Sequence, residues 1–309
     1  MAFSGLQSLG LISVADKWIR DSRKVLIDRI AQALARRLGL KRYEQRISAI
    51  ERRLDDVASS VSTWAVSQWI EQAVLEKTPL ISVILPTHNR SQILRRAVAS
   101  VVAQAYPNWE IIVIDDGSTD DTPAVIAGLH DEVGQQRLRA IRIEPSGVCA
   151  ARNHGLAAAR GDFICYLDDD NIMQRLWLKA VAWAFAQRPD VDVLYGGIVI
   201  DDTLRLNRKS SGALPTYFLN PYDRQKLLTH NLADIGVLAH RSGIPEARFD
   251  ESLREMGDWD LLVRITRAKS PLVLPVLACF YSTEGADRLS GGSTFDADLA
   301  RVREKASKC

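Results

Sequence analysis

The chain has 309 residues, with 40 Lys and Arg against 38 Asp and Glu, a net charge of +2 and 47% hydrophobic residues. This composition is typical of a soluble globular protein and excludes a chain that is disordered throughout. The length suits one large domain or two ordinary ones. No apolar run approaches the ~20 residues that a membrane-spanning helix needs, so the chain is not expected to cross a membrane by itself.

The charge is unevenly distributed along the chain. Residues 17–53 carry 12 Lys and Arg against 4 Asp and Glu, a local charge of +8, so the remainder of the chain is acidic on balance. These basic residues are not interleaved with a groove-reading motif or a stacking platform, so no nucleic-acid partner is expected. The sequence therefore divides into a basic N-terminal arm and a mildly acidic body.

The cysteines show no C-x-x-C spacing, which argues against a zinc cluster and against a disulfide framework. They read as reduced thiols, and they are Cys149, Cys165, Cys279 and Cys309. The N-terminus lacks the basic-then-apolar order of a secretory signal. We therefore expect a cytoplasmic protein. It could also bind peripherally at the inner face of the plasma membrane.

The N-terminal arm is expected to be helical, because proline is absent between Val14 and Leu75 and apolar residues recur at helical spacing. Residues 3–38 fit a basic amphipathic helix on anionic lipid, although a solvated charged helix explains them equally well. Residues 40–64 carry a heptad seam, which predicts a homo-oligomeric coiled coil. The alternative is a long helix folded against the body. The seam residues are Leu40, Tyr43, Ile47, Ile50, Leu54, Val57, Val61 and Trp64.

From Pro79 onwards the pattern alternates between short apolar runs and amphipathic stretches. Such alternation predicts a mostly parallel sheet that is covered by helices. The expected strands are 80–85, 110–114, 137–143, 163–167 and 191–200, and the expected helices are 91–104, 121–129, 148–159 and 177–186.

Polar side chains follow four successive strands, and in open parallel sheets ligands bind beyond the carboxyl ends of the strands. These runs are P-T-H-N-R at 86–90, D-D-G-S-T-D-D at 115–121, E-P-S-G at 144–147 and D-D-D-N at 168–171. Adjacent carboxylates repel each other unless a positive group is bound between them. The triplet Asp168, Asp169 and Asp170 therefore predicts a site for a hard divalent cation.

Four motifs, in this order, resemble family 2 glycosyltransferases: I-S-V-I-L-P-T-H-N-R, I-I-V-I-D-D-G-S-T-D-D-T, A-R-N-H-G-L-A-A-A-R-G-D and C-Y-L-D-D-D-N. The resemblance covers about 80–285 and implies an α/β GT-A (Rossmann-like) fold, a mostly parallel sheet flanked by helices. The expected organisation is an α-helical and coiled-coil arm at 1–76 and a GT-A domain at 77–309. That domain would have a donor half (about 80–200), an acceptor half (about 201–285) and a C-terminal loop and helix (286–309).

The resemblance also implies roles for the polar residues on the donor side. Asp116 would accept a hydrogen bond from the base or ribose, and Arg152 would pair with the diphosphate, helped by backbone N–H groups near Ser146 and Gly147. Asp170, supported by Asp168, would bind Mn²⁺ or Mg²⁺ as a DXD motif, and Asp169 would contact ribose or sugar. The full set expected to bind the nucleotide sugar is Pro86, Thr87, Asn89, Arg90, Asp116, Ser146, Gly147, Arg152, Asp168 and Asp169.

Downstream, F-D-E-S-L at 249–253 and G-D-W-D-L-L-V-R at 257–264 are similar to the family's acceptor-side segment. Asp258 takes the position of the general base, and Gly257 stands where the family more often has Glu. Asp260 is the competing base, but two residues along a helix it points elsewhere, so it is expected to position the helix or to pair with a nearby arginine. The loop at 287–292 resembles one that closes over the donor.

Several polar residues have a simpler structural interpretation. Asp120 and Asp121 are expected to lie in a solvated turn or to cap a helix. His88 and His154 are expected to form local hydrogen bonds rather than to bind a metal ion, and Trp259 is expected in the core.

The sequence thus predicts a metal-dependent, inverting glycosyltransferase of hexosyltransferase type. It would transfer sugar from a nucleoside-diphosphate donor, with UDP the best guess, to a hydroxyl of a glycan or lipid-linked acceptor in surface polysaccharide synthesis. An inactive GT-A-like scaffold in a polysaccharide assembly complex is one alternative. A nucleotidyltransferase is another, but it should carry a glycine- and lysine-rich loop after the first strand, and residues 86–90 do not.

Overall fold

The computed structural model describes residues 41–201, 216–282 and 295–307. The chain divides into two compact units, Met1–Ala58 and Ser59–Cys309. Helix α2 (Lys41–Gln72) begins in the first unit and ends in the second, so the helix expected over 40–64 is present and runs further. The amphipathic helix expected at 3–38 lies outside the described residues, as does the loop expected at 287–292.

The last turns of α2 pack within the second unit. Ile70 is fully buried, and the Trp69 ring meets the Trp183 ring edge-on at 4.7 Å between centroids. The Thr63 and Tyr217 hydroxyls are hydrogen-bonded at 2.5 Å. This end of the helix is therefore held by apolar burial together with a side-chain hydrogen bond.

Nine strands of the described chain form one sheet, in the order β3-β2-β1-β4-β8-β6-β9-β5 with β7 beside β6. The first four are parallel, as predicted: β1 (Ile81–Thr87), β2 (Trp109–Asp116), β3 (Leu138–Ile143) and β4 (Phe163–Tyr166).

The second half of the sheet is mixed. β8 is antiparallel to both β4 and β6, β6 is parallel to β9, and β5 and β7 are antiparallel to β9 and β6. The bounds of these strands are β5 (Ile172–Met173), β6 (Val193–Asp201), β7 (Thr216–Phe218), β8 (Leu238–Arg241) and β9 (Leu272–Ser282).

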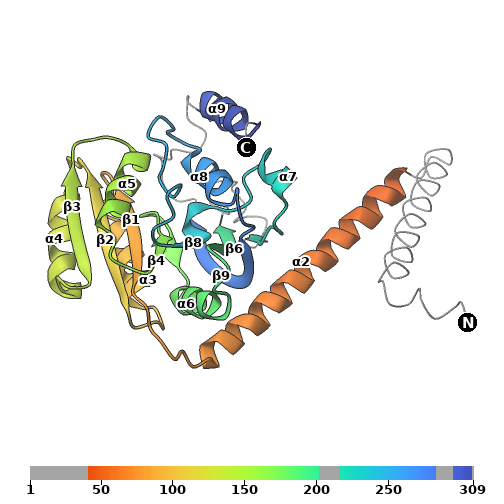
Figure 1. Ribbon diagram of the computed structural model, residues 1–309, viewed down its shortest axis with the longest axis horizontal. Helices are drawn as coiled ribbons and strands as arrows, with labels where there is room; N and C mark the ends of the chain where they lie inside the picture. Colours follow the sequence, from red (N-terminus) through yellow and green to blue (C-terminus); the bar gives the residue numbers. More distant parts are fainter. Residues whose placement is uncertain (1–40, 202–215, 283–294, 308–309) are drawn as a thin grey trace, which may run out of the picture. The chain divides into compact units, whose positions relative to one another are not determined.

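Helices lie against both faces of the parallel half (Figure 1). Ile112 and Ile114 of β2 pack with Ala151 of α5, whereas the alternate residues Ile111 and Val113 belong to the main core that α3 and α4 enter. This alternation follows from the two-residue side-chain period of a strand. The first four body helices, close to the predicted ranges, are α3 (Leu94–Val102), α4 (Thr122–Val133), α5 (Val148–Ala158) and α6 (Trp177–Gln187).

Further helical elements follow β6 in the described part of the chain. These are α7 (Arg224–Leu227), the 3-10 turn η3 (Ile235–Val237), α8 (Gly257–Ile265) and the C-terminal α9 (Phe295–Ser307). Helix α9 packs against α8 (Figure 1). Of these elements, η3 and α8 contribute Ile235 and Asp258 to the lining of the candidate site.

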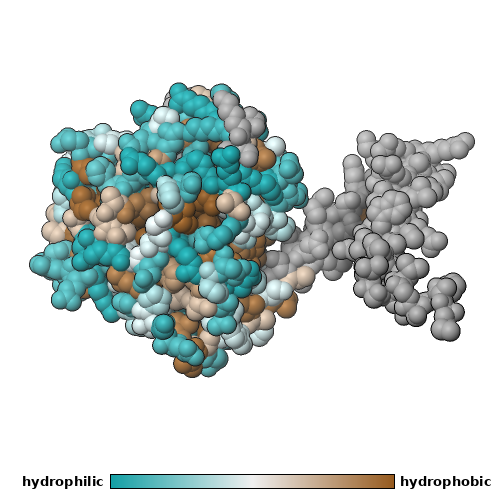
Figure 2. Space-filling model, in the orientation of Figure 1, coloured by the Kyte–Doolittle hydropathy of each residue, from teal (hydrophilic) through white to brown (hydrophobic). Residues whose placement is uncertain are grey.

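The described cysteines are free and buried, as expected of structural thiols, and burial raises the pKa of the Cys149 thiol to about 11. On the face shown in Figure 2, hydrophilic residues cover most of the surface around smaller hydrophobic areas. None of the described helices has both the length and the apolar character that crossing a membrane requires.

Candidate active site

The loops that follow β1, β2 and β3 begin at one edge of the sheet, because the last residues of these parallel strands lie opposite one another. Thr87 lies opposite Asp115, and Asp116 lies opposite Ile143. Beyond this edge is a cavity of about 920 Å³. Of the residues that the sequence predicts for the site, Ser146 does not line it, and those that do are Pro86, Thr87, Asn89, Arg90, Asp116, Gly147, Arg152, Asp168, Asp169, Asp170 and Asp258.

The loop after β1 is tied to the loop after β2. Asn89 has a positive φ of 52°, which asparagine tolerates better than most residues, and its side-chain oxygen accepts the Thr119 N–H at 2.7 Å. His88 Nδ1 lies 2.6 Å from the Asp116 carbonyl oxygen, the local hydrogen bond expected of it. Asp120 accepts the Thr122 N–H at 2.9 Å in the turn before α4, whereas Asp121, the N-cap residue of α4, makes no side-chain capping hydrogen bond.

Asp116 is held by the loop that precedes α5. Its Oδ1 accepts the Ser146 N–H at 2.7 Å and its Oδ2 accepts the Gly147 N–H at 2.9 Å. Gly147 has φ 91°, a left-handed conformation that glycine adopts without strain. The sequence-based expectation aimed these two N–H groups at a diphosphate. In the structure they donate to Asp116 instead, so their effect is to orient that carboxylate.

The preceding acid, Asp115, has a different role. It is buried, and its carboxylate accepts the Ser118 N–H at 2.9 Å and the Arg142 guanidinium at 3.0 Å. Of this neighbouring pair, only Asp116 lines the cavity.

Arg152 and the acid triplet form the floor of the donor side. Arg152 is only 6% exposed, and its Nη2 donates to Asp168 Oδ1 at 2.6 Å. Thr87 donates its hydroxyl to Asp169 Oδ2 at 2.7 Å. Burial raises the pKa of Asp169 to about 7, and the charge of Asp170 adds to the rise. Within the triplet, Asp168 is thus the acid that pairs with the buried guanidinium, and Asp169 pairs with Thr87.

The resemblance implies a divalent cation bound by carboxylates of the acid triplet. Across residues 41–201, 216–282 and 295–307, no group of three or more His, Cys, Asp and Glu side chains could hold a metal ion. Mg²⁺ at phosphate-binding sites is commonly held by one or two carboxylates, with substrate phosphates and water completing the shell. Asp168 and Asp170 both line the cavity, so this pair fits a site of that kind.

The acceptor side is built around Asp258 in the first turn of α8. Its Oδ2 accepts the Asn231 side-chain amide at 2.8 Å, and its Oδ1 accepts the Trp259 N–H at 2.7 Å. Burial raises the pKa of the Asp258 carboxyl, while the charge of Arg152 and these hydrogen bonds oppose the rise. A carboxylate with a raised pKa is a better proton acceptor than an ordinary aspartate, so Asp258 suits general-base chemistry.

The neighbouring acid, Asp260, faces away from the cavity, as expected. It is 1% exposed, and its Oδ2 accepts Arg264 Nε at 2.8 Å, while Lys305 Nζ lies 3.3 Å from its Oδ1. Trp259 is buried, and its indole N–H donates to the Leu227 carbonyl at 2.6 Å, in agreement with a core position. Of the two acids of α8, Asp258 therefore lines the cavity, whereas Asp260 forms buried ion pairs within the fold.

Gly257, at the start of α8, allows a close approach between two helix N-termini. A Cβ atom at this position would lie 2.5 Å from Cys149 Sγ in the first turn of α5. Real Cβ atoms essentially never come this close, so a side chain here would force α8 and α5 apart. Glycine at position 257 is therefore compatible with the close packing of α8 on Cys149 of α5.

Sequence reasoning missed several residues of the cavity. Asn231 and Asp234 come from the stretch between α7 and η3, and Arg254, Glu255 and Met256 immediately precede α8. Asp234 accepts the Gly236 N–H at 2.8 Å, and burial raises its pKa to about 7. None of these residues follows a parallel strand. The one signal available was the position of Arg254 directly after the F-D-E-S-L motif.

Comparison with known proteins identifies the family. The family described as Glycosyl transferase family 2 matches residues 82–244, which is more than half of the chain. The chain belongs to glycosyl transferase family 2. The predicted family and the predicted enzyme class, a glycosyltransferase, are thereby confirmed.

One curated relative is the "Putative colanic acid biosynthesis glycosyl transferase WcaA" of Escherichia coli. It is 30% identical over 196 residues, which cover 62% of this chain and 67% of that protein. This chain spans smaller shares, 10%, 38% and 60%, of the next three relatives.

Two solved structures are similar in fold. S. aureus TarS in complex with UDP-GlcNAc has a TM-score of 0.59 at 20% identity, over 74% of this chain and 65% of that one. The mannosyltransferase PcManGT from Pyrobaculum calidifontis, in complex with GDP-Man and Mn²⁺, has a TM-score of 0.52 at 17% identity, over 84% of each chain. At these identities the likeness concerns the fold, and it confirms the GT-A-like α/β architecture.

Proposed function

We propose that the chain is a metal-dependent, inverting glycosyltransferase of surface polysaccharide synthesis. It would move a sugar from a nucleoside-diphosphate donor, with a UDP-sugar as the best candidate, to a hydroxyl of a glycan or lipid-linked acceptor. The observation that carries the proposal is that Asp116, Arg152, the acid triplet and Asp258 line one cavity. The colanic acid assignment of the E. coli relative and the nucleotide sugars bound to the two structural neighbours support it.

On the donor side, Asp116 would recognise the nucleoside. Its carboxylate is fixed by two backbone N–H groups and keeps further lone pairs for a base or ribose donor, such as the N3–H of uracil. Pro86, Thr87, Asn89 and Arg90 would border the nucleoside. A site built to accept a hydrogen bond rejects bases that lack the matching donor.

The diphosphate would lie between Arg152 and the acid triplet. A guanidinium pairs with phosphate through two parallel hydrogen bonds, and the Nε of Arg152 is buried without a partner in the described part of the chain. Asp170 and Asp168 would hold Mn²⁺ or Mg²⁺, which would supply positive charge against the charge that grows on the departing diphosphate. Asp169 would contact the ribose or the transferred sugar.

At the reaction centre, Asp258 would accept the proton of the acceptor hydroxyl as the hydroxyl oxygen forms its bond to C1 of the sugar. The bond from C1 to the diphosphate oxygen breaks, and its electron pair leaves with the nucleoside diphosphate. Because attack comes from the side opposite the leaving group, the anomeric configuration is inverted. Asn231 and the Trp259 N–H hold the carboxylate in one orientation throughout.

Helix α2 would mediate self-association through its seam. Ile47, Ile50, Val61 and Trp64 are all more than half exposed, so described members of the seam are open to a partner. The basic residues at 3–38 would place the enzyme at the inner face of the plasma membrane. Light scattering of the full chain at several concentrations tests the first proposal, and a particle that stays monomeric contradicts it.

A donor screen in the presence of Mn²⁺ tests the enzymatic proposal. We expect one nucleotide sugar, a UDP-sugar first, to be turned over by the wild type, and Asp170→Asn to lose metal-dependent turnover. Asp120→Asn is the matched control, because this acid lies in the turn before α4 and does not line the cavity, and it should keep activity. Absence of turnover with every donor, or full activity of Asp170→Asn, contradicts the proposal.

A further inference from the structure

The segment between residues 250 and 256 forms part of the acceptor side of the cavity. Arg254, Glu255 and Met256 line it, directly before the catalytic helix α8. The segment lies beyond residues 82–244, which the family match covers, so that match assigns it no role.

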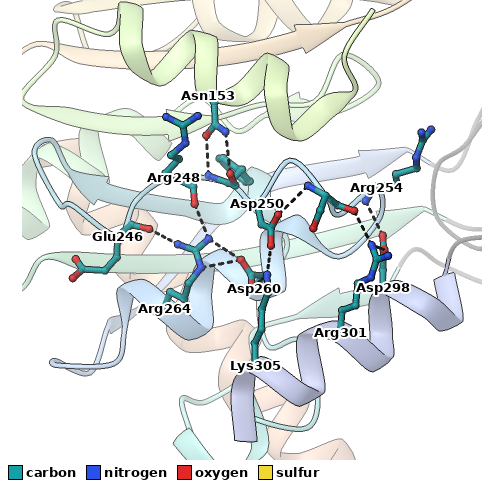
Figure 3. A network of polar contacts seen from close by, with 12 residues as sticks. Asn153, Glu246, Arg248, Asp250, Arg254, Asp260, Arg264, Asp298, Arg301 and Lys305 are labelled. Atoms are coloured by element: carbon teal, nitrogen blue, oxygen red, sulfur yellow. Dashed lines mark hydrogen bonds and ion pairs between the residues drawn. The ribbon is translucent and has the colours of Figure 1, made fainter. Parts of the chain in front are cut away.

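Helix α9 holds this segment by three side chains. Asp298 accepts the N–H groups of Arg254 at 2.7 Å and Glu255 at 2.9 Å, both through one carboxylate oxygen. Arg301 Nη1 donates to the Ser252 carbonyl at 3.0 Å, and Lys305 Nζ donates to the Asp250 carboxylate. Figure 3 shows these contacts side by side along α9.

The spacing of the three side chains explains how one helix makes all the contacts. Positions 298, 301 and 305 fall on one face of a helix, at i, i+3 and i+7. Val302 and Ala306 on α9 are 1% exposed, so apolar burial anchors the helix beside the polar contacts. Asp298 itself is 2% exposed, and a buried carboxylate that accepts two N–H groups fixes the backbone it binds.

The backbone of Arg254 is fixed, but its guanidinium is not used by the described fold. The side chain is exposed, and within residues 41–201, 216–282 and 295–307 its guanidinium has no hydrogen bond or ion pair. In Figure 3 it extends away from the network around Asp298. Arg254 therefore lines the cavity on a backbone that is already ordered and has an exposed guanidinium that is not paired within the described residues.

We propose that Arg254 binds a phosphate of a substrate diphosphate and that Asp298 is its positioning residue. The inference rests on the proposed function and adds a second arginine, on the acceptor side, to the diphosphate contact of Arg152. The planar guanidinium matches phosphate geometry. Fixing the backbone beforehand lowers the ordering cost of binding. The diphosphate belongs either to the nucleotide donor or to a lipid-linked acceptor. In both cases the group that Arg254 binds is a phosphate of a diphosphate.

Calorimetric titration of inorganic pyrophosphate into the full chain, in metal-free buffer, tests the contact. We expect Arg254→Gln to weaken pyrophosphate binding about tenfold, the order of one charge-assisted hydrogen-bonded contact. Arg303→Gln is the matched control, because it removes an exposed arginine of α9 that does not line the cavity, and it should bind as the wild type does. Equal binding by the two variants, or no binding by the wild type, overturns the proposal.

A second titration, of UDP in the presence of Mn²⁺, separates the two sources. If the donor supplies the diphosphate, Arg254→Gln weakens UDP as well as pyrophosphate. If a lipid-linked acceptor supplies it, only pyrophosphate binding falls. Unchanged pyrophosphate binding by Arg254→Gln would contradict the role of Arg254. If the wild type still binds UDP in a metal-dependent way, the proposed function remains supported.

The positioning role of Asp298 is tested by a double variant. Asp298→Asn should weaken pyrophosphate binding about threefold to fivefold, less than loss of the guanidinium itself. If Asp298 acts through Arg254, the double variant binds no more weakly than Arg254→Gln alone. Effects that multiply in the double variant contradict the positioning role. Arg301→Gln, which removes the Ser252 contact and the ion pair of Arg301 with Asp298, repeats the test if Asp298→Asn does not fold.

Discussion

The donor and acceptor halves of the cavity are built in different ways. Thr87, Asp116 and Asp168 lie at or just beyond the ends of parallel strands, so the register of the sheet places them. On the acceptor side, Asp258 lies in the first turn of α8 and is oriented by Asn231, and α9 holds the segment before that helix. Backbone pairing therefore sets the donor geometry, whereas side-chain contacts across long stretches of sequence set the acceptor geometry.

Each half nevertheless contains a pair of close acids with divided roles. On the donor side, Asp116 lines the cavity and Asp115 is paired with Arg142. On the acceptor side, Asp258 lines the cavity and Asp260 is paired with Arg264. If this division is correct, substitutions within one pair should separate loss of turnover from loss of stability.

The largest expected effect comes from Asp258→Asn. Removal of the general base should lower kcat by about 10²- to 10⁴-fold, because the amide cannot accept the hydroxyl proton. Affinity for the donor should remain near the wild-type value, since the donor contacts proposed here lie on the other half. Steady-state kinetics together with UDP titration measure both quantities, and wild-type kcat in this variant removes the base assignment.

The dependence of the wild-type rate on pH also tests whether Asp258 is the general base. Only the carboxylate form of Asp258 can accept a proton, and burial raises its pKa. Activity should therefore fall with decreasing pH at a value above that of an ordinary aspartate. A rate that stays constant down to the usual aspartate range would contradict a buried carboxylate base.

Asp260→Asn should damage stability rather than turnover per folded molecule. The substitution leaves Arg264 without its buried partner and weakens the contact of Lys305 from α9. We expect a loss of about 3 kcal/mol in the free energy of unfolding, as for other broken buried ion pairs. Denaturant unfolding measures it, with Arg188→Gln, an exposed pair with Asp190, as the control that should cost less than about 1 kcal/mol.

The smallest expected effect concerns the junction of the two halves. Gly257→Ala should push α8 away from α5, because the new methyl group meets Cys149 Sγ. We expect the free energy of unfolding to fall by about 1–3 kcal/mol and kcat to fall as well. Cys149→Ala removes that sulfur. The double variant Gly257→Ala with Cys149→Ala should regain part of the lost stability and part of the lost kcat. A double variant no better than Gly257→Ala would show that another contact excludes a side chain there.

The elements of the donor half could be predicted from the sequence because local signals determine them. The apolar run that ends at Pro86 and the acids after Leu167 mark strand ends, and parallel pairing brings strand ends together. The direction of the N–H groups of Ser146 and Gly147 was not predictable, because it depends on the positive φ of Gly147.

The acceptor half was less predictable because its geometry depends on contacts distant in sequence. Asn231 becomes part of the site through its hydrogen bond to Asp258, and Arg254 through the hold of Asp298 from α9. Neither residue lies in a periodic pattern or at the end of a parallel strand. The mixed pairing around β8 likewise departs from the parallel expectation, because β8 runs antiparallel to both of its neighbours.

Calorimetry with UDP and Mn²⁺ tests the division between the two halves most directly. The account predicts metal-dependent heat of binding for the wild type, the same heat for Asp258→Asn, and none for Asp170→Asn. Absence of metal-dependent heat in the wild type would instead support a catalytically inactive scaffold. Loss of the heat in Asp258→Asn would contradict the assignment of that residue to the acceptor side.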